Sequence, residues 1–154
     1  MRRLALLVCA FLTAALCAAP AAARIGEQPQ AFAQGPLIHQ LQLTFQGQQP
    51  LAGAPAGRVL HRYVSDDGLI TVDVIVRGGG IEQQVMYVPL DMRRGGQVSF
   101  FLQDALGSVV GAQRGLLAFR AAVTNRSITT MRWGAITVRF APLDKSMLQV
   151  LAAR

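Results

Sequence analysis

The clearest pattern lies in the middle of the chain, where apolar and polar residues alternate in segments that turn residues separate. The segments Arg58–Val64 and Leu69–Arg77 are rich in β-branched and aromatic residues, which is typical of β-strands. Ser65–Gly68 contains two aspartates and a glycine and predicts a tight turn. Gly78–Gly80 predicts a second reversal, into a third strand over Ile81–Leu90. Together these segments predict a three-stranded antiparallel meander.

The alternation also predicts which side chains share a face of this meander. Setting Val64 opposite Leu69 makes Arg62 and Asp73 diagonal neighbours on the solvent face. We therefore expect an exposed ion pair between them, worth under about 1 kcal/mol. The same pairing turns His61 toward the core. The predicted core face consists of Val59, His61, Tyr63, Ile70, Val72, Val74, Ile81, Val85 and Tyr87, and it also includes Gln83.

Periodicity in the flanking segments predicts further strands and helices. Leu37–Phe45 alternates toward its end, as a strand with one wet face does, and Gln46–Gly57 has the prolines and glycines of a loop. Gln97–Leu106 carries apolar residues at helical spacing, and Gly107 is placed to end that helix. Four more elements are predicted: one or two helical turns within Arg24–Gln34, strands over Leu116–Thr124 and Ala135–Ala141, and a closing helix over Leu143–Ala153.

This order of elements predicts a single α+β domain over residues 24–154. Its antiparallel sheet combines the three-stranded meander with two or three further strands. One or two short helices pack against that sheet. The length after residue 23 suits one domain with its own core.

The first residues have the three parts of a secretory signal peptide. Met1–Arg3 is basic, Leu4–Ala19 is apolar, and three alanines then precede Arg24. The apolar run is shorter than the roughly 20 residues of a membrane-spanning helix. We therefore expect a signal peptide over residues 1–23, cleavage near Ala23–Arg24, and export to the periplasm or the medium. A signal anchor that stays uncleaved is the alternative.

Removal of this segment changes the composition of the chain. Both cysteines, Cys9 and Cys17, leave with it, so the mature protein has no disulfide and no thiolate site. The net charge of +7 falls to +5, with 13 basic residues against 8 acidic ones. Apart from Arg93–Arg94, the basic residues of the mature chain are scattered. This pattern favours a solvated basic surface, and we expect no nucleic-acid partner for an exported protein.

Few residues have the spacing that catalysis or metal binding requires. His39 and His61 lack a second histidine at ligand spacing, and no serine has the setting of a catalytic nucleophile. Asp66–Gly68 has too few acids for a calcium loop and is read as a turn. We therefore expect no catalytic residue, no metal and no cofactor.

One candidate site is an anion site where the helix over Gln97–Leu106 begins. Free backbone N–H groups and the positive end of the helix dipole would meet two guanidinium groups there. The residues are Arg93, Arg94, Gly95 and Gly96.

The start Arg24–Glu27, Phe32 and the meander resemble small exported bacterial proteins of unknown function whose mature chains begin Ile-Gly-Glu. The layout resembles the two-layer α+β domains of outer-membrane assembly lipoproteins and of β-lactamase inhibitor proteins. The chain departs from that pattern after Gln34, where Gly35–Pro36 leads toward a strand, and it lacks a lipobox. The resemblance implies a fold and no activity.

These observations favour a non-enzymatic binding or interaction module of the bacterial cell envelope, which contacts a protein or an envelope surface through its sheet or a strand edge. The first alternative is an envelope hydrolase or other enzyme whose acids, such as Asp66, Asp67 or Asp73, converge only in the fold. The second is a signal-anchored envelope protein. No motif identifies the ligand, the partner or the oligomeric state.

Overall fold

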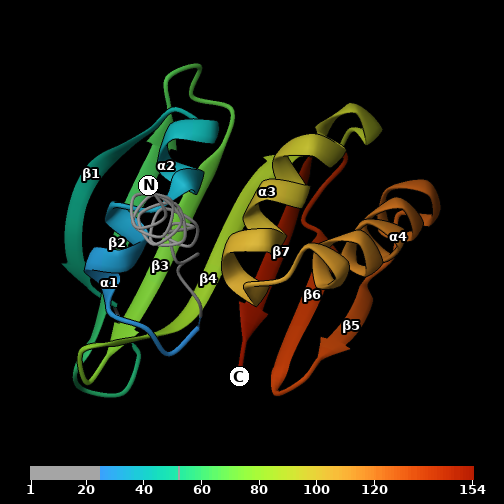
Figure 1. The fold of residues 1–154 in the computed structure, drawn as a ribbon. Coiled ribbons are helices and arrows are strands. Elements are labelled where there is room, and N and C mark those ends of the chain that lie inside the picture. The colour runs from blue at the N-terminus through green and yellow to red at the C-terminus, as the bar shows by residue number, and fades with distance from the viewer. Residues whose placement is uncertain (1–24, 52) are drawn as a thin grey trace, which may run out of the picture.

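The computed structural model describes residues 25–51 and 53–154, and within them one seven-stranded antiparallel sheet organises the chain (Figure 1). The predicted signal peptide lies outside the described residues. The strands are β1 (Leu43–Pro50), β2 (Arg58–Ser65), β3 (Thr71–Arg77), β4 (Gly80–Pro89), β5 (Thr129–Trp133), β6 (Ile136–Pro142) and β7 (Met147–Ala153). The helices are α1 (Pro29–Ala33), α2 (Pro36–Gln40), α3 (Gly95–Leu106) and α4 (Val109–Asn125), with a 3-10 turn, η1 (Met92–Arg94), before α3.

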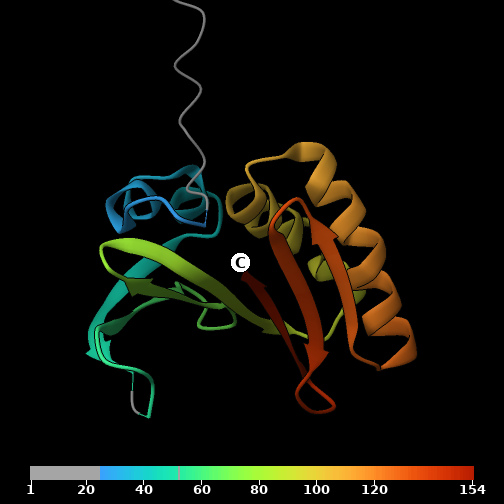
Figure 2. The ribbon, with the colours of Figure 1, turned by 90° about the horizontal axis from the view of Figure 1, so that it is seen from below.

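The sheet has the strand order β1-β2-β3-β4-β7-β6-β5, so β1 and β5 are its edges. The helices lie against one face, with α1 and α2 over the β1 side and α4 beside β5 and β6 (Figures 1 and 2). The core fills the space between these layers, and its largest fully buried side chains include Phe32, Phe101, Phe119 and Phe140. The predicted α+β class with an antiparallel sheet is confirmed, and the sheet is larger than expected.

The meander β2-β3-β4 is present, but the pairing of β2 with β3 differs from the expected one by two residues. Val64 pairs with Thr71, and Arg62 lies directly opposite Asp73. The turn keeps four residues but is displaced by one position, to residues 66–69, because Ser65 pairs with Ile70 through backbone and hydroxyl hydrogen bonds. A shift of two residues keeps every side chain on its predicted face, since strand side chains alternate with a period of two.

The predicted face of β4 is correct at Ile81 and wrong beyond it. A bulge at Glu82 places Ile81 opposite Val76 but Gln83 opposite Ile75, which adds one residue to β4. Val85 and Tyr87 therefore lie on the face away from the helices. The side chains that face the helices after the bulge are Gln84, Met86 and Val88.

Two predicted elements have the wrong type. The expected strand Leu116–Thr124 lies within helix α4, and the expected closing helix Leu143–Ala153 is a turn followed by strand β7. Strand β7 is buried at alternate positions between β4 and β6. Pairing on both sides therefore outweighs the helix propensity of its leucines and alanines.

Other predicted elements are confirmed or corrected in their bounds. The helix over Gln97–Leu106 is α3, which ends at Gly107 with a φ of 60° in the left-handed region. The strand Ala135–Ala141 is β6. The segment Leu37–Phe45 divides into α2 and the start of β1, and β1 continues into the predicted loop Gln46–Gly57. Strand β5 was not predicted.

Candidate functional site

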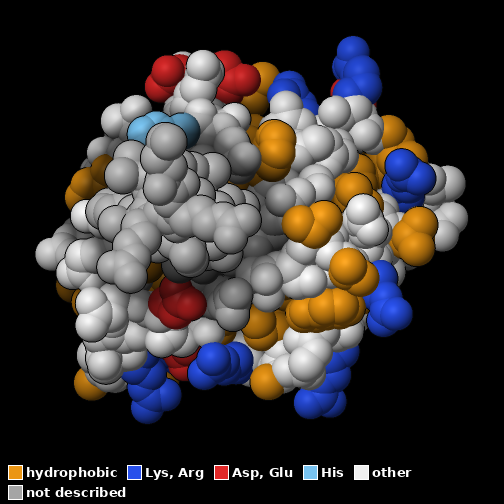
Figure 3. All heavy atoms as spheres, in the orientation of Figure 1, with side chains coloured by type: hydrophobic (Ala, Val, Ile, Leu, Met, Phe, Trp, Pro, Cys, Tyr) orange, Lys and Arg blue, Asp and Glu red, His pale blue; other side chains and the backbone are white. Residues whose placement is uncertain are grey.

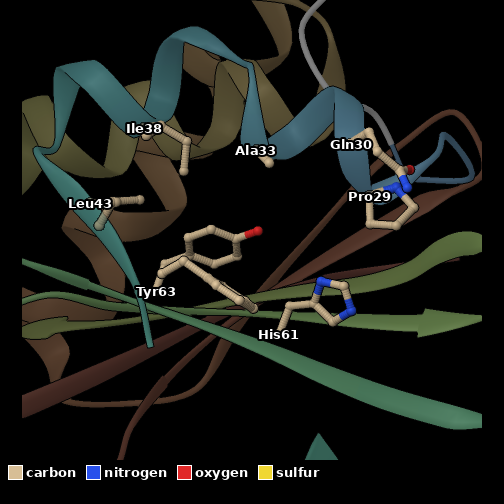
Figure 4. A pocket seen from close by; sticks show the side chains of 8 residues that line it. Pro29, Gln30, Ala33, Ile38, Leu43, His61 and Tyr63 are labelled. Atoms are coloured by element: carbon tan, nitrogen blue, oxygen red, sulfur yellow. The ribbon is translucent and has the colours of Figure 1, made fainter. Parts of the chain in front are cut away.

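A cavity of about 340 Å³ lies between helices α1 and α2 on one side and the edge strand β1 with its neighbour β2 on the other (Figure 4). Most of the side chains that form its wall are apolar, and the polar groups are an amide, an imidazole and a phenol. The lining residues are Pro29, Gln30, Ala33, Ile38, Leu43, Phe45, His61 and Tyr63.

Strand β2 forms the floor of this cavity. His61 and Tyr63 are two residues apart and therefore point to the same face of the strand. Tyr63 is 5% exposed, and its ring packs against Phe32 of α1 at 4.9 Å between centroids. His61 is only half-buried, although the sequence predicted a core histidine, because α1 covers Tyr63 but leaves the cavity above the imidazole.

Burial raises the pKa of the Tyr63 phenol, because the charged form loses solvation there. The hydroxyl therefore remains protonated at neutral pH. A protonated phenol donates one hydrogen bond and accepts others.

Phe45 forms the rim on strand β1. Its side chain is 51% exposed, and its ring lies 5.2 Å from Tyr63 and 5.9 Å from His61 between centroids. The strand bulges directly after Phe45, where Gly47 has a φ of 123° that a residue with a side chain rarely adopts. The three rings form one aromatic surface that extends from the core to the solvent.

Two short helices form the roof of the cavity. Each has a proline at its first turn, Pro29 in α1 and Pro36 in α2, where a missing N–H costs no helical hydrogen bond. Gly35 joins them, and a Cβ at this position would lie 3.1 Å from the Ala31 carbonyl oxygen. The glycine therefore allows the sharp change of direction that turns both helices over β1 and β2.

Asp91 occupies much of the predicted anion site. Its carboxylate accepts hydrogen bonds from the backbone N–H of Arg93 at 2.9 Å and from the guanidinium of Arg93 at 2.6 and 2.8 Å. Hydrogen bonding to Arg93 lowers the pKa of Asp91, so the carboxylate stays charged. Arg94 ends η1, and Gly95 and Gly96 begin α3. The anion site stays a prediction, and an added anion would compete with Asp91 for Arg93.

The three acids considered for catalysis each have a separate structural partner. Asp67 accepts a hydrogen bond from the Ser65 hydroxyl at 2.6 Å and one from the Leu69 backbone, and the first of these chiefly lowers its pKa. Asp66 lies 3.5 Å from the Thr44 hydroxyl. Asp73 pairs with Arg62 on the face away from the helices. Over residues 25–51 and 53–154, no group of three His, Cys, Asp or Glu residues could hold a metal ion.

The comparison with known proteins gives no relative. No family model, no curated protein and no solved structure matches this chain. Its own residues are therefore the only basis for a functional proposal.

The sequence did not predict the cavity, although it contains part of the signal. Leu43 and Phe45 alternate with polar residues, and the structure has both on the same face of β1. The alternation could not show that helices α1 and α2 cover Tyr63 and leave the Phe45 side chain exposed. That exposure depends on where α1 and α2 pack, which is a property of the tertiary structure.

Proposed function

We propose that this chain is an exported, non-enzymatic binding module of the bacterial cell envelope. It binds an extended segment of a partner protein along the free edge of β1 and accepts one apolar side chain of that segment in the cavity beside His61 and Tyr63. The observation that carries this proposal is the apolar cavity at the open edge of the sheet, with the exposed ring of Phe45 at its rim.

The size and chemistry of the cavity favour a single apolar group as its occupant. Ligand pockets commonly measure roughly 300–1,000 Å³, and this cavity is at the small end of that range. Its wall combines apolar side chains with a few polar groups, a combination that fixes the orientation of a ligand. Burial of the exposed Phe45 ring by a partner would add apolar contact area, which favours association.

Strand β1 offers a backbone edge next to the cavity. Edge strands present unpaired N–H and C=O groups, and natural proteins often protect them with charged side chains. Residues 43–50 contain no charged residue, whereas β5, at the other edge, contains Arg132. An added strand could therefore pair with β1, and alternate side chains of that strand would meet the cavity.

Filling the cavity tests this proposal. Ala33 lines the cavity and is exposed, so Ala33→Trp should close the cavity without disturbing the core. Ala135 is exposed in the turn between β5 and β6, and Ala135→Trp is the matched control. Peptides selected from a random library against the native protein should bind the control normally and bind Ala33→Trp at least about tenfold more weakly.

A crosslinking experiment locates the contact. A photoreactive amino acid at Phe45 should give an adduct with a protein of the native envelope, and the same group at Arg132 should give none of that adduct. Ala33→Trp should abolish the adduct at position 45. Selected peptides that bind both tryptophan variants equally well would contradict the proposal.

A further inference from the structure

The charges of this protein divide between the two halves of its chain. Residues 25–104 contain five basic and seven acidic residues, whereas residues 105–154 contain seven basic residues and one acid, Asp144. Residues 105–143, which cover α4, β5 and β6, include five arginines and no acid. This part of the molecule therefore attracts anions most strongly.

Exposed apolar side chains gather in the same part of the chain. The described residues include eight large apolar side chains that are exposed, and five of them lie between residues 105 and 143. Figure 3 shows hydrophobic and basic side chains close together on the side of the molecule where Figure 1 places α4. The five are Val109, Val110, Leu117, Ile128 and Leu143.

Two glycines fix which face of α4 points outward. A Cβ at Gly115 would lie 2.6 Å from Leu102, and one at Gly111 would lie 3.0 Å from the Trp133 ring. The absence of side chains at these two positions lets α4 pack closely on α3 and β5. The exposure of Leu117, at 65%, therefore follows from the packing of the opposite side of the helix.

The outward face of α4 has an apolar centre, formed by Val110 and Leu117, between basic flanks, and the exposed side chains of Gln113 and Thr124 lie on the same face. Val110 and Leu117 are seven residues apart and lie within about 20° of each other around the helix. Arg114 and Arg120 lie about 60° to either side of Leu117. The guanidinium of Arg114 also lies 5.6 Å from the centre of the Trp133 ring, which holds it beside the helix.

We propose that this outward face of α4 docks on an anionic lipid bilayer, with the helix parallel to the surface. Apolar side chains between arginines are typical of helices that lie in the membrane interface, where long basic side chains reach the headgroups. Within the described residues, no helix has the length and hydropathy of a membrane span. The proposal is independent of the cavity at β1, because β1 and β5 are opposite edges of the sheet.

Charge and polarity distinguish this occupant from others. A second copy of the chain would bring its own Arg114 and Arg120 close to those of the first copy. Repulsion between these like charges opposes such a dimer. A polyanion such as nucleic acid or heparin would bind the arginines but would leave Val110 and Leu117 exposed. An anionic bilayer buries the apolar centre and neutralises both flanks.

Vesicle sedimentation tests the charges. The protein should bind vesicles of phosphatidylcholine and phosphatidylglycerol but not vesicles of phosphatidylcholine alone. The double variant Arg114→Glu/Arg120→Glu should bind the anionic vesicles at least about tenfold more weakly, since each basic residue near such a surface contributes substantially. The variant Lys145→Glu/Arg154→Glu, at two exposed basic residues outside α4, makes the same change in net charge and should bind within about twofold of the native protein.

A second variant tests the apolar centre. Val110→Ser/Leu117→Ser changes only exposed side chains, so it should fold normally, keep its retention on heparin and bind the vesicles several-fold more weakly. Normal vesicle binding by this variant would overturn the proposal in favour of a polyanion or an acidic protein surface. Equal losses in the two charge variants would overturn it as well, because net charge alone would then explain the binding.

Discussion

Arg62 of β2 and Asp73 of β3 lie directly opposite each other, and two hydrogen bonds of 2.8 Å join the guanidinium to the carboxylate. The side chain of Asp73 is 3% exposed, although the described helices cover the other face of the sheet. The side chain of Arg62 is 45% exposed. The sequence predicted the pair but treated it as exposed. The burial of Asp73 changes its energetic role, because a carboxylate without a partner is costly away from water.

We expect Arg62→Ala to lower the free energy of unfolding by about 1–2 kcal/mol, because it leaves Asp73 buried without its charged partner. The double variant Arg62→Leu/Asp73→Leu should lose less than the two single leucine variants together, since it removes both charges. Urea denaturation measures all of these values. Additivity within about 0.3 kcal/mol would show that the two side chains are not coupled.

Gly115 and Gly96 provide a matched pair of helical glycines. A Cβ at Gly115 would lie 2.6 Å from Leu102 and 3.2 Å from the sulfur of Met131, whereas a Cβ at Gly96 would meet no described atom within 4 Å apart from its chain neighbours and its own helix backbone. We expect Gly115→Ala to lower the melting temperature, because overpacking costs about 1–3 kcal/mol and outweighs a gain of up to about 1 kcal/mol in helix propensity. Gly96→Ala should leave it unchanged or raise it. A higher melting temperature for Gly115→Ala would contradict the close packing of α4 on α3.

Glu82 should contribute to stability in a pH-dependent way. Its carboxylate accepts two hydrogen bonds of 2.6 Å from Arg58, which chiefly lower its pKa, and Arg77 lies 3.7 Å away. A lowered pKa in the folded state stabilises the protein above the unfolded value of about 4.3, and this contribution is lost as the pH falls through the folded value.

The substitution Glu82→Gln should therefore lower the melting temperature at neutral pH, with a difference that shrinks in acid. Thermal unfolding followed over a pH series measures this convergence. If the difference in melting temperature between the two proteins stayed constant into strong acid, the charge of Glu82 would not be its cause.

Processing of the N-terminus is the remaining prediction. If residues 1–23 form a cleaved signal peptide, protein isolated from its native host should begin at Arg24. Mass spectrometry of the intact protein measures this directly. Retention of Met1 on membrane-bound material would instead favour an uncleaved anchor.

The sequence predicted the central part of the fold well because its signals are local. Turn residues and alternation identified β2 and β3 and their faces, and the helical spacing of apolar residues identified α3. The bulge at Glu82 could not be predicted, because it depends on how β4 pairs with β3. A single added residue reversed the faces of Val85 and Tyr87.

The errors in α4 and β7 have a different origin. The predicted strand Leu116–Thr124 is mostly apolar and contains Phe119 and Val123, and Gly115 next to it weakened any helical signal. In the structure, Gly115 instead allows α4 to pack closely against Leu102 of α3. Neither contact is visible locally, since Gly115 meets Leu102 and β7 meets β4 only through tertiary packing.

The position of β7 between β4 and β6 has a consequence for how the chain folds. Among the described residues, β7 is the only strand that joins the four strands β1–β4 to the hairpin of β5 and β6. It is also the last of the seven to leave the ribosome, and it pairs residues as distant as Gln83 and Ala153. Such long-range pairing is slow to form. Until β7 pairs, a folding chain therefore exposes the edges of β4 and β6 in addition to those of β1 and β5, and the two parts of the sheet join late.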